Sequence, residues 1–315
     1  MKCLIYMPAL NEADHIKQVI EKLPRELPGI DEIEYLVVDD GSKDKTAQYA
    51  QESGAVVVSH NRNRGVGAAF HSAVNYALNV GADILVGIDA DGQFNPDEIQ
   101  NLIQPIVQKK ADMVIGNRFT SGRPANMSAI KFWGNQQVIN IVNTITHNNF
   151  HDVSCGFRAY GWEALLRMNI VGEFTYTHET ILSLSFHGLN IIEYPVWVKY
   201  DTDRKSRVAS NILHYAMQSS KIILRVLLDY RPIRVFGLFG SICIIIGTLF
   251  EVFLMSYYFL AGSFSPYKST GFIGLGFLVF GLLVLVIALI ADMLNRMRVN
   301  QDKILYEIKR IRYKK

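Results

Sequence analysis

The chain has 315 residues, enough for one large or two ordinary domains, and half of them are hydrophobic. The mean hydropathy of +0.14 is high for a purely soluble protein. Residues 1–198 carry 15 Lys and Arg against 22 Asp and Glu, whereas residues 199–234 and 292–315 each carry 8 against 3. Residues 235–291, between these two basic segments, carry one charge of each sign. This distribution is typical of a membrane protein and excludes nucleic acid as the expected partner.

The first 120 residues alternate between short apolar runs and amphipathic segments. We expect strands at residues 3–7, 35–38, 55–58, 84–88 and 113–115, and helices at residues 13–23, 45–52, 67–78 and 96–107. Strands that alternate with helices imply an α/β fold with a doubly wound, mostly parallel sheet.

Polar residues follow four of these strands, at the point where each strand ends. In doubly wound sheets, ligands bind beyond the carboxyl ends of the strands, so these residues predict one site at one edge of the sheet. The four segments are Pro8-Ala9-Leu10-Asn11-Glu12, Asp39-Asp40-Gly41-Ser42, Asp89-Ala90-Asp91 and Gly116-Asn117-Arg118.

Asp89 and Asp91 are the candidate metal ligands. Hard divalent cations that bind diphosphates are typically held by one or two carboxylates together with phosphate oxygens. Both carboxylates would converge on one cation, or one would hold the cation and the other a sugar or ribose hydroxyl. An acid pair of this kind is weak evidence alone, since most are solvated loops, and it gains weight from the neighbouring motifs.

Asp39 and Asp40 are either turn residues beside a helix cap or acceptors for the hydroxyl and N–H groups of a nucleotide. Residues 63–69 look like a dinucleotide fingerprint, but Phe70 replaces the third glycine and the stretch follows the third strand. We therefore reject a Rossmann cofactor site and interpret Gly65 and Gly67 as a tight helix start.

Residues 124–198 depart from the simple alternation. Residues 130–145 form an amphipathic segment that is either core or a helix at a membrane surface. Residues 152–158 read as a polar loop, residues 173–185 as a helix, and residues 194–198 as a further strand. Within the helix, Glu179 is either structurally paired or faces the site, and His178 is interpreted as structural because Leu182 stands where a second ligand would be needed.

Two apolar blocks near the C-terminus qualify as membrane spans. Residues 235–261 contain one charge, Glu251, and residues 271–291 contain none, whereas a span needs about 20 apolar residues. Arginines flank the pair on both outer sides, so the positive-inside rule places both termini and the acidic domain in the cytoplasm and the loop outside. Gly237 and Ser241, four residues apart, are expected to let the spans pack closely.

These features predict four regions. They are a catalytic domain at residues 1–207, an amphipathic interfacial helix at 208–234, two spans with a short external loop at 235–291, and a basic tail helix at 292–315. The three cysteines, Cys3, Cys155 and Cys243, have neither metal-site nor disulfide spacing and are expected to be reduced, buried thiols.

The chain resembles the family-2 glycosyltransferases in its first four motifs, the third of which continues to Gln93. The fold of that family is the nucleotide-sugar-binding α/β type called GT-A. Later segments are similar to the polyprenyl-phosphate sugar synthases, of the dolichol-phosphate mannose synthase type. These segments are Asp152…Gly156-Phe157-Arg158, Glu179, Glu193-Tyr194-Pro195-Val196 and Tyr200…Arg204-Lys205-Ser206-Arg207. Members of that family often have Gly-Lys-Ser-Lys where this chain has Arg204-Lys205-Ser206-Arg207, so the charge is kept and a glycine hinge is not.

The resemblance implies transfer of a hexose from a GDP- or UDP-linked sugar to a polyprenyl phosphate at a lipid bilayer, with Mg2+ or Mn2+. Catalysis would involve Asp89, Asp91 and Arg118, with Asp89 and Asp91 as metal ligands. The nucleotide would contact Pro8, Asn11, Glu12, Asp39, Asp40 and Asp89. The donor sugar would contact Asp91, Gln93 and Glu179. The acceptor phosphate would contact Arg118, Arg204, Lys205, Ser206 and Arg207. The sugar, the length of the polyprenol and homo-oligomerisation stay open.

Simple chemistry supports this reaction independently. A phosphate monoester acceptor is already anionic near neutral pH and needs no general base, but it needs cations beside it, which arginine provides. A single in-line attack would invert the anomeric centre. A processive polysaccharide synthase shares the first motifs but normally has more spans and a Gln-x-x-Arg-Trp segment, and this chain has no Arg-Trp pair. A non-catalytic nucleotide-sugar sensor is disfavoured by the intact acid pair.

Overall fold

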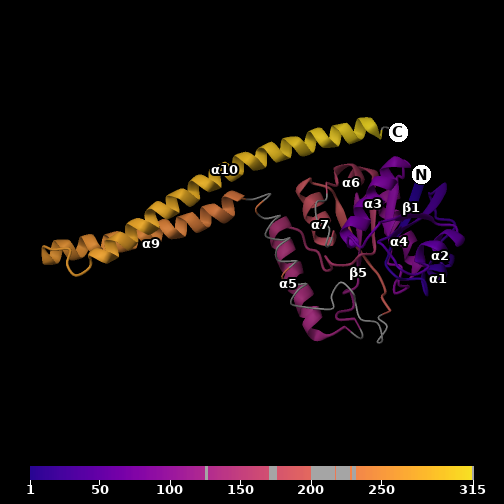
Figure 1. The fold of residues 1–315 in the computed structure, drawn as a ribbon, viewed down its shortest axis with the longest axis horizontal. Coiled ribbons are helices and arrows are strands. Elements are labelled where there is room, and N and C mark those ends of the chain that lie inside the picture. Colours follow the sequence, from indigo (N-terminus) through magenta and orange to yellow (C-terminus); the bar gives the residue numbers. More distant parts are fainter. Residues whose placement is uncertain (125–126, 170–175, 200–216, 218–227, 229–231, 314–315) are drawn as a thin grey trace. The chain divides into compact units, whose positions relative to one another are not determined.

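The computed structural model describes residues 1–124, 127–169, 176–199, 217, 228 and 232–313 (Figure 1). The chain divides into two compact units. The first comprises Met1–Ile223 together with Leu305–Lys315, and the second comprises Leu224–Ile304. The acceptor residues predicted at 204–207 lie outside the described residues.

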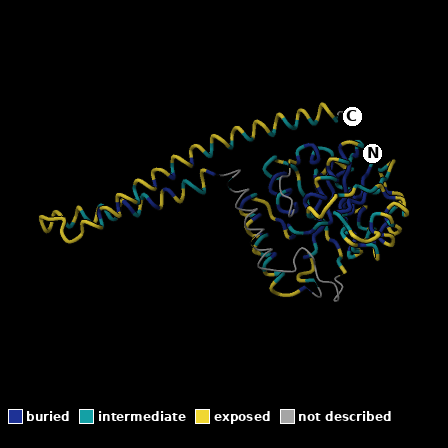
Figure 2. Tube along the Cα trace, in the orientation of Figure 1, coloured by how far each residue is buried: buried dark blue, intermediate teal, exposed yellow. Residues whose placement is uncertain are grey.

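The first unit is built on a seven-stranded sheet with the order β3-β2-β1-β4-β6-β5-β7. The strands are β1 (Lys2–Ala9), β2 (Glu32–Asp39), β3 (Val56–Ser59), β4 (Ile84–Gly87), β5 (Met113–Asn117), β6 (Arg158–Gly161) and β7 (Ile191–Pro195). Residues 3–7 of β1 are fully buried, as expected for a central strand covered on both faces (Figure 2). The predicted α/β fold with a mostly parallel sheet is therefore confirmed.

Strand β6 is the part of the sheet that the sequence did not reveal. It pairs antiparallel with both β4 and β5, whereas every other strand pair is parallel. Its four residues, Arg-Ala-Tyr-Gly, lack an apolar run or an alternating pattern, so their start was interpreted as loop. Because β6 is inserted between β4 and β5, those two strands still run in the same direction. The carboxyl ends of β1, β2, β4 and β5 therefore lie along one edge of the sheet.

The helices of this unit agree with the predicted positions to within a few residues, except α6, which was not predicted. They are α1 (Ile16–Glu21), α2 (Thr46–Glu52), α3 (Val66–Asn79), α4 (Ile99–Val107), α5 (Ala129–Thr146), α6 (Trp162–Arg167) and α7 (Thr177–Phe186), with a short 3-10 turn, η1 (Pro96–Glu98), before α4. Helix α3 packs its small residues against β1 and β2. Gly65 precedes α3 with a φ of 93°, as expected for a glycine that starts a helix.

Helix α5 has both a core face and an exposed face. Ile139, Val142 and Ile145 are buried, whereas Ile130 and Trp133 are each 65% exposed. The core interpretation is correct for the second half of the helix. The first half presents large apolar side chains outward, so the membrane-surface alternative stays open for it.

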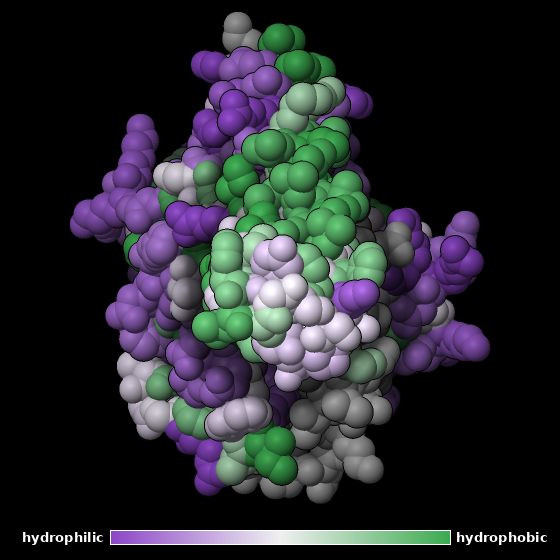
Figure 3. Space-filling view, turned by 90° about the vertical axis from the view of Figure 1, so that its left-hand side faces the viewer, coloured by the Kyte–Doolittle hydropathy of each residue, from purple (hydrophilic) through white to green (hydrophobic). Residues whose placement is uncertain are grey.

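The second unit contains two long apolar helices, α9 (Pro232–Ala261) and α10 (Lys268–Arg312). Among the described residues these are the two helices long and apolar enough to cross a membrane. Figure 3 faces the turn that joins them and shows an apolar helix surface beside a paler turn. Helix α10 runs without a break from the predicted second span into the predicted tail. Its 45 residues correspond to about 68 Å at 1.5 Å per residue, roughly twice the thickness of a bilayer core.

Close packing of α9 on α10 depends on glycines other than the predicted pair. A Cβ at Gly237 would meet nothing within 4 Å, and Ser241 is exposed, so the prediction for this pair is wrong. A Cβ at Gly240 would lie 3.0 Å from the Gly281 carbonyl oxygen, and one at Gly247 would lie 2.7 Å from that of Gly274. The contact stripe thus lies on a different face of α9 from Gly237 and Ser241.

Candidate active site

The acid pair lies where β4 ends at the carboxyl edge of the sheet. Burial and the negative charge of Asp91 raise the pKa of Asp89 to about 7, with a smaller contribution from Glu12, while the charge of Arg118 opposes the rise. A Cβ at Gly156 would lie 3.5 and 3.6 Å from the two carboxylate oxygens of Asp89. Glycine therefore leaves free the space that a side chain would fill next to this carboxylate.

The donor set fits a divalent cation that shares its ligands with a diphosphate. Two neighbouring carboxylates repel each other, and a bound cation would remove that repulsion. Among the described residues no group of three or more His, Cys, Asp or Glu side chains is arranged to hold a metal. The site is thus not a closed protein cage, and two carboxylates with ligand oxygens are what Mg2+ normally accepts.

An aromatic cluster lies next to Asp89 and was not predicted. The hydroxyl groups of Tyr6 and Tyr176 are 3.2 Å apart, and Tyr176 stacks on Phe70 with ring centroids 4.0 Å apart. Burial raises the pKa of both tyrosines, and the charge of Asp89 adds to this effect. Buried tyrosines carry no periodic signal that would separate them from ordinary core, so the sequence could not reveal this cluster.

Two loops at the ends of β1 and β2, where the nucleotide contacts were predicted, hydrogen-bond to each other. The backbone N–H of Asn11 donates to Ser42 Oγ at 2.9 Å, and the Asn11 side-chain oxygen accepts from the Lys43 N–H at 2.8 Å. Asp39 is buried and accepts from the Ser42 N–H at 2.9 Å. Asn11, at a φ of 51°, thus shapes the loop, which is a role that a ligand-contact prediction does not include.

The other predicted nucleotide contacts lie on the same edge. Pro8 pairs with Val38 within β1 and β2. Glu12 is 8% exposed, and its N–H donates to Thr46 Oγ1 at 2.8 Å. The carboxylate of Asp40 is used within the protein, accepting from the backbone N–H groups of Arg64 and Gly65.

Arg118 is held in place by a buried carboxylate. Its Nε and Nη2 atoms donate to the two oxygens of Asp152 at 2.6 and 2.9 Å, and Nη2 also donates to Ser154 Oγ at 2.7 Å. Burial opposes ionisation of Asp152, but the charge of Arg118 and its hydrogen bonds outweigh this effect, so the pKa of Asp152 lies below its ordinary value. Such a two-point pair fixes the plane of the guanidinium group.

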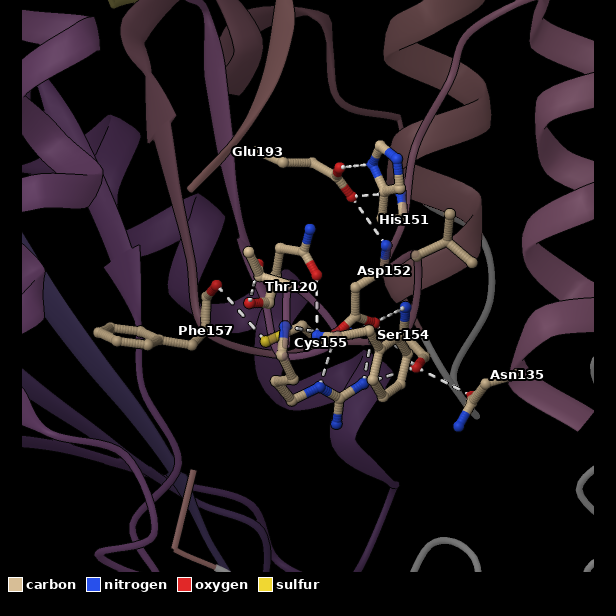
Figure 4. A network of polar contacts seen from close by, with 12 residues as sticks. Thr120, Asn135, His151, Asp152, Ser154, Cys155, Phe157 and Glu193 are labelled. Carbon is tan, nitrogen blue, oxygen red and sulfur yellow. Dashed lines mark hydrogen bonds and ion pairs between the residues drawn. The ribbon is translucent and has the colours of Figure 1, made fainter. Parts of the chain in front are cut away.

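Strand β7 anchors the loop that carries Asp152. The carboxylate of Glu193 accepts from the backbone N–H groups of His151 and Asp152, each at 2.7 Å, and contacts His151 Nδ1 at 2.8 Å (Figure 4). The fully buried Arg158 holds the other side of the same loop, donating to the carbonyl oxygens of Val153 and Cys155. The loop is therefore fixed from both ends.

Lys131, in the first turn of α5, is a second cation that the sequence did not single out. Ser128 caps this helix by accepting from the Lys131 N–H at 3.3 Å. Burial lowers the pKa of the Lys131 ammonium group, and the positive charge of Arg118 lowers it further. Two like charges within reach of each other favour an anionic ligand between them. A single lysine in an amphipathic helix gives no sequence signal for this role.

Gln93 borders the acid pair, and the other two residues, Glu179 and His178, lie on α7. The Gln93 N–H donates to Asp91 Oδ1 at 3.1 Å, and the Gln93 carbonyl oxygen accepts from the Lys199 N–H at 3.0 Å. Glu179 is half-buried in the first turn of α7. His178 is fully buried, and burial followed by the charge of Arg158 lowers its pKa to about 4, which agrees with the structural interpretation.

An acid pair and a fixed arginine at the carboxyl edge of a mostly parallel sheet agree with the predicted glycosyltransferase of GT-A fold. The family model "Glycosyl transferase family 2" matches residues 4–166, more than half of the chain. The chain therefore belongs to glycosyltransferase family 2 and is an enzyme of that class.

Two relatives with assigned activities are similar to the chain over most of their own length. The chain is 31% identical over 220 residues to the UDP-N-acetylglucosamine–dolichyl-phosphate N-acetylglucosaminyltransferase of Methanococcus voltae, a match that covers 62% of this chain and 86% of the relative. It is 28% identical over 210 residues to the undecaprenyl-phosphate mannosyltransferase of Micrococcus luteus, covering 62% of this chain and 83% of the relative.

A solved structure confirms the fold. Glucosyl-3-phosphoglycerate synthase from Mycobacterium tuberculosis, crystallised with Mn2+, UDP and glucosyl-3-phosphoglycerate, is similar with a TM-score of 0.57 and 19% identity. The similarity covers 71% of this chain and 79% of that chain.

Proposed function

We propose that this glycosyltransferase moves a hexose from a nucleotide-diphosphate sugar to a polyprenyl phosphate at a membrane. The observation that carries the proposal is the pairing of an acid site, Asp89 and Asp91, with Arg118 at the same carboxyl edge of the sheet. Lys131, in the first turn of α5, adds a second positive charge near Arg118. The names of the archaeal and bacterial relatives support a polyprenyl-phosphate acceptor. The two long apolar helices support a membrane location.

On the donor side, Asp89 and Asp91 would hold Mg2+ or Mn2+. When bound, the cation would neutralise the charge that develops on the departing nucleoside diphosphate. Mn2+ or Mg2+ together with UDP in the structural neighbours supports this assignment. Gln93, which borders the acid pair, and Glu179, in the first turn of α7, would orient the donor sugar.

The nucleotide would lie against the ends of β1 and β2. Pro8, Glu12 and Asp39 would contact it. Asn11 and Asp40 contribute by fixing the two loops, since their side-chain oxygens accept backbone N–H groups of the protein. The choice between GDP and UDP would be made here.

On the acceptor side, Arg118 and Lys131 would bind the lipid phosphate. Residues Arg204 to Arg207 would add to this site, and the described chain leads towards them from Lys199, whose N–H donates to Gln93 beside the acid pair. A phosphate oxygen would attack the anomeric carbon as the bond from that carbon to the diphosphate oxygen breaks. The bonding electrons leave with the nucleoside diphosphate, no general base is needed, and the anomeric centre inverts.

The membrane arrangement follows from charge. Basic residues on both outer sides of the two spans favour a cytoplasmic catalytic unit and cytoplasmic termini, with the turn between α9 and α10 on the other side.

Transfer of label from donor to lipid tests the function. Purified protein with Mn2+ and a short polyprenyl phosphate would receive labelled GDP-mannose, UDP-glucose or UDP-N-acetylglucosamine, and label would be counted in the organic phase. We expect transfer from one donor that stops when a chelator is added. Absence of transfer from every donor, with nucleotide still bound, would contradict the proposed acceptor, and a product with retained anomeric configuration would contradict in-line attack.

A further inference from the structure

A chain of three polar side chains lies behind the nucleotide end of the site. His60 follows β3, and its Nδ1 atom lies 2.7 Å from Asp40 Oδ1, while its Nε2 atom lies 2.9 Å from Ser72 Oγ on α3. The side chains of His60 and Asp40 are each 7% exposed. These hydrogen-bonded side chains connect the end of β2 with the second turn of α3.

The chemistry of the three groups fixes the direction of the hydrogen bonds. A carboxylate only accepts, so Nδ1 of His60 carries the proton that it shares with Asp40. In the neutral imidazole, Nε2 then accepts from the hydroxyl of Ser72. His60 is also held through its backbone, since its N–H donates to the Asp39 carbonyl oxygen at 2.8 Å. The imidazole is therefore held at both ring nitrogens, and the residue is also held through its backbone.

Asp40 in turn hydrogen-bonds to the turn that precedes α3. Its Oδ1 atom accepts from the Arg64 N–H at 2.9 Å, and its Oδ2 atom accepts from the Gly65 N–H at 2.8 Å. The turn also presses against the neighbouring Gly41, where a Cβ would lie 2.6 Å from the backbone carbon of Arg62. The Asp40–Gly41 segment and the turn before α3 thus form one wall at the carboxyl edge of the sheet.

Serine, histidine and aspartate also form hydrolytic triads, but the position of Ser72 is wrong for that chemistry. Nucleophilic serines in such triads lie on exposed turns beside backbone N–H groups that stabilise an oxyanion. Ser72 lies inside α3, where backbone N–H groups are used in helical hydrogen bonds. The three residues are therefore better explained as a clamp than as a catalytic unit.

We propose that His60 is a positioning residue for nucleotide binding, which holds Asp40 on the Arg64–Gly65 turn and thereby fixes the wall against which the nucleotide of the donor binds. The inference rests on the proposed function, because it assigns the nucleotide to this end of the edge. His60 acts only through Asp40 and does not touch the reacting atoms. Its loss therefore weakens donor binding and leaves turnover at saturating donor nearly unchanged.

Paired substitutions separate the two ends of the clamp. His60→Gln keeps a polar group near the position of Nε2 and loses the contact with Asp40, whereas His60→Asn keeps a donor near the position of Nδ1 and loses Ser72. Ser72→Ala removes only the far end. His71→Gln, at the exposed neighbouring position on α3, is the matched control.

The measurements are the Kd of UDP and GDP with Mn2+ by calorimetry, the KM of the donor, kcat, and the melting temperature in detergent. We expect His60→Gln to raise the nucleotide Kd and the donor KM about tenfold, equivalent to about 1.4 kcal/mol, with kcat within about twofold of wild type. His60→Asn and Ser72→Ala should each raise them about two- to threefold, and His71→Gln should change neither.

Unchanged nucleotide affinity in His60→Gln and Ser72→Ala, or a fall in kcat with unchanged KM, would overturn the inference. A lower melting temperature with unchanged nucleotide Kd would show a purely structural role and also overturn it. If His60→Gln does not fold, His60→Asn and Ser72→Ala decide the question. Wild-type protein that binds neither nucleotide would instead contradict the proposed function, which distinguishes the two failures.

Discussion

Substitution of Asp152 by asparagine tests whether a buried carboxylate sets the position of Arg118. Asp152 is fully buried and accepts two side-chain hydrogen bonds from Arg118, at 2.6 and 2.9 Å, and a third from its backbone N–H at 3.2 Å. Asparagine has nearly the same shape but offers one oxygen and one NH2 group. At one of the two guanidinium contacts, the asparagine NH2 group would thus face an N–H group of Arg118, and both groups are donors.

The expected magnitude follows from this loss. Removing one partner of a buried ion pair typically costs about 3–5 kcal/mol, and because asparagine keeps one acceptor we expect about 3 kcal/mol of unfolding free energy. Displacement of an arginine that stabilises developing charge should lower kcat/KM for the acceptor about 100-fold. Because the pKa of Asp152 is lowered in the folded state, its stabilising effect is present above its unfolded pKa and is lost as the pH falls through the folded value. The Asp152→Asn variant should not show this loss of stability at low pH.

The assay is donor-saturated label transfer with varied polyprenyl phosphate, together with thermal unfolding at pH 3 to 7. Glu163→Gln is the control, since Glu163 forms a partly exposed pair with Arg167 on α6 and should cost at most about 1 kcal/mol. If Asp152→Asn is less stable but keeps the wild-type kcat/KM, Asp152 does not position Arg118 for catalysis and the reasoning is refuted.

Three further outcomes are expected. Because the pKa of Asp89 is raised to about 7, the metal-free folded state binds an extra proton and should lose stability as the pH rises from about 4 to 7. Mn2+ should reverse this trend, and Asp89→Asn should abolish it. A melting temperature independent of pH would contradict the raised pKa. Lys131→Met should raise the KM of the polyprenyl phosphate about tenfold with the donor KM unchanged, and equal changes in both would argue against an acceptor role. Gly247→Val should weaken packing of the two long helices by about 1–3 kcal/mol in denaturant titrations, whereas Gly237→Val should not, and equal effects would disprove the contact assignment.

Periodicity and strand-end chemistry were sufficient to predict the parallel part of the sheet. Strands β1 and β4 contain continuous buried apolar runs, and β2 contains the shorter buried run of residues 36–38. Each strand is followed by acidic residues that a simple turn does not require. The two long apolar helices were equally clear, because their length and composition leave few alternatives.

Features that depend on tertiary contacts could not be read in this way. Strand β6 has no apolar pattern of its own and forms only because β4 and β5 leave a place between them. The choice of Gly240 and Gly247 over Gly237 depends on the rotation of α9 about its axis, which a nearly uniform apolar sequence does not specify. Lys131 acquires meaning only from the nearness of Arg118.

The predicted site residues also divide by role in a way that spacing alone cannot show. Asn11 and Asp40 were expected to touch the nucleotide, yet their side-chain oxygens accept backbone N–H groups of neighbouring loops. Short polar motifs identify the location of a site, whereas hydrogen-bond partners show which of its side chains also shape the loops, as Asn11, Asp39 and Asp40 do.

The most direct test of the central claim compares two acceptors that differ only in the phosphate. Wild-type protein with Mn2+ and its preferred donor would be given a polyprenyl phosphate or the free polyprenol of the same length, and label would be counted in the organic phase. We predict transfer to the phosphate and none to the alcohol, because the site has cations for an anionic acceptor and the reaction uses no general base. Equal transfer to both lipids, or transfer to the alcohol alone, would contradict the account.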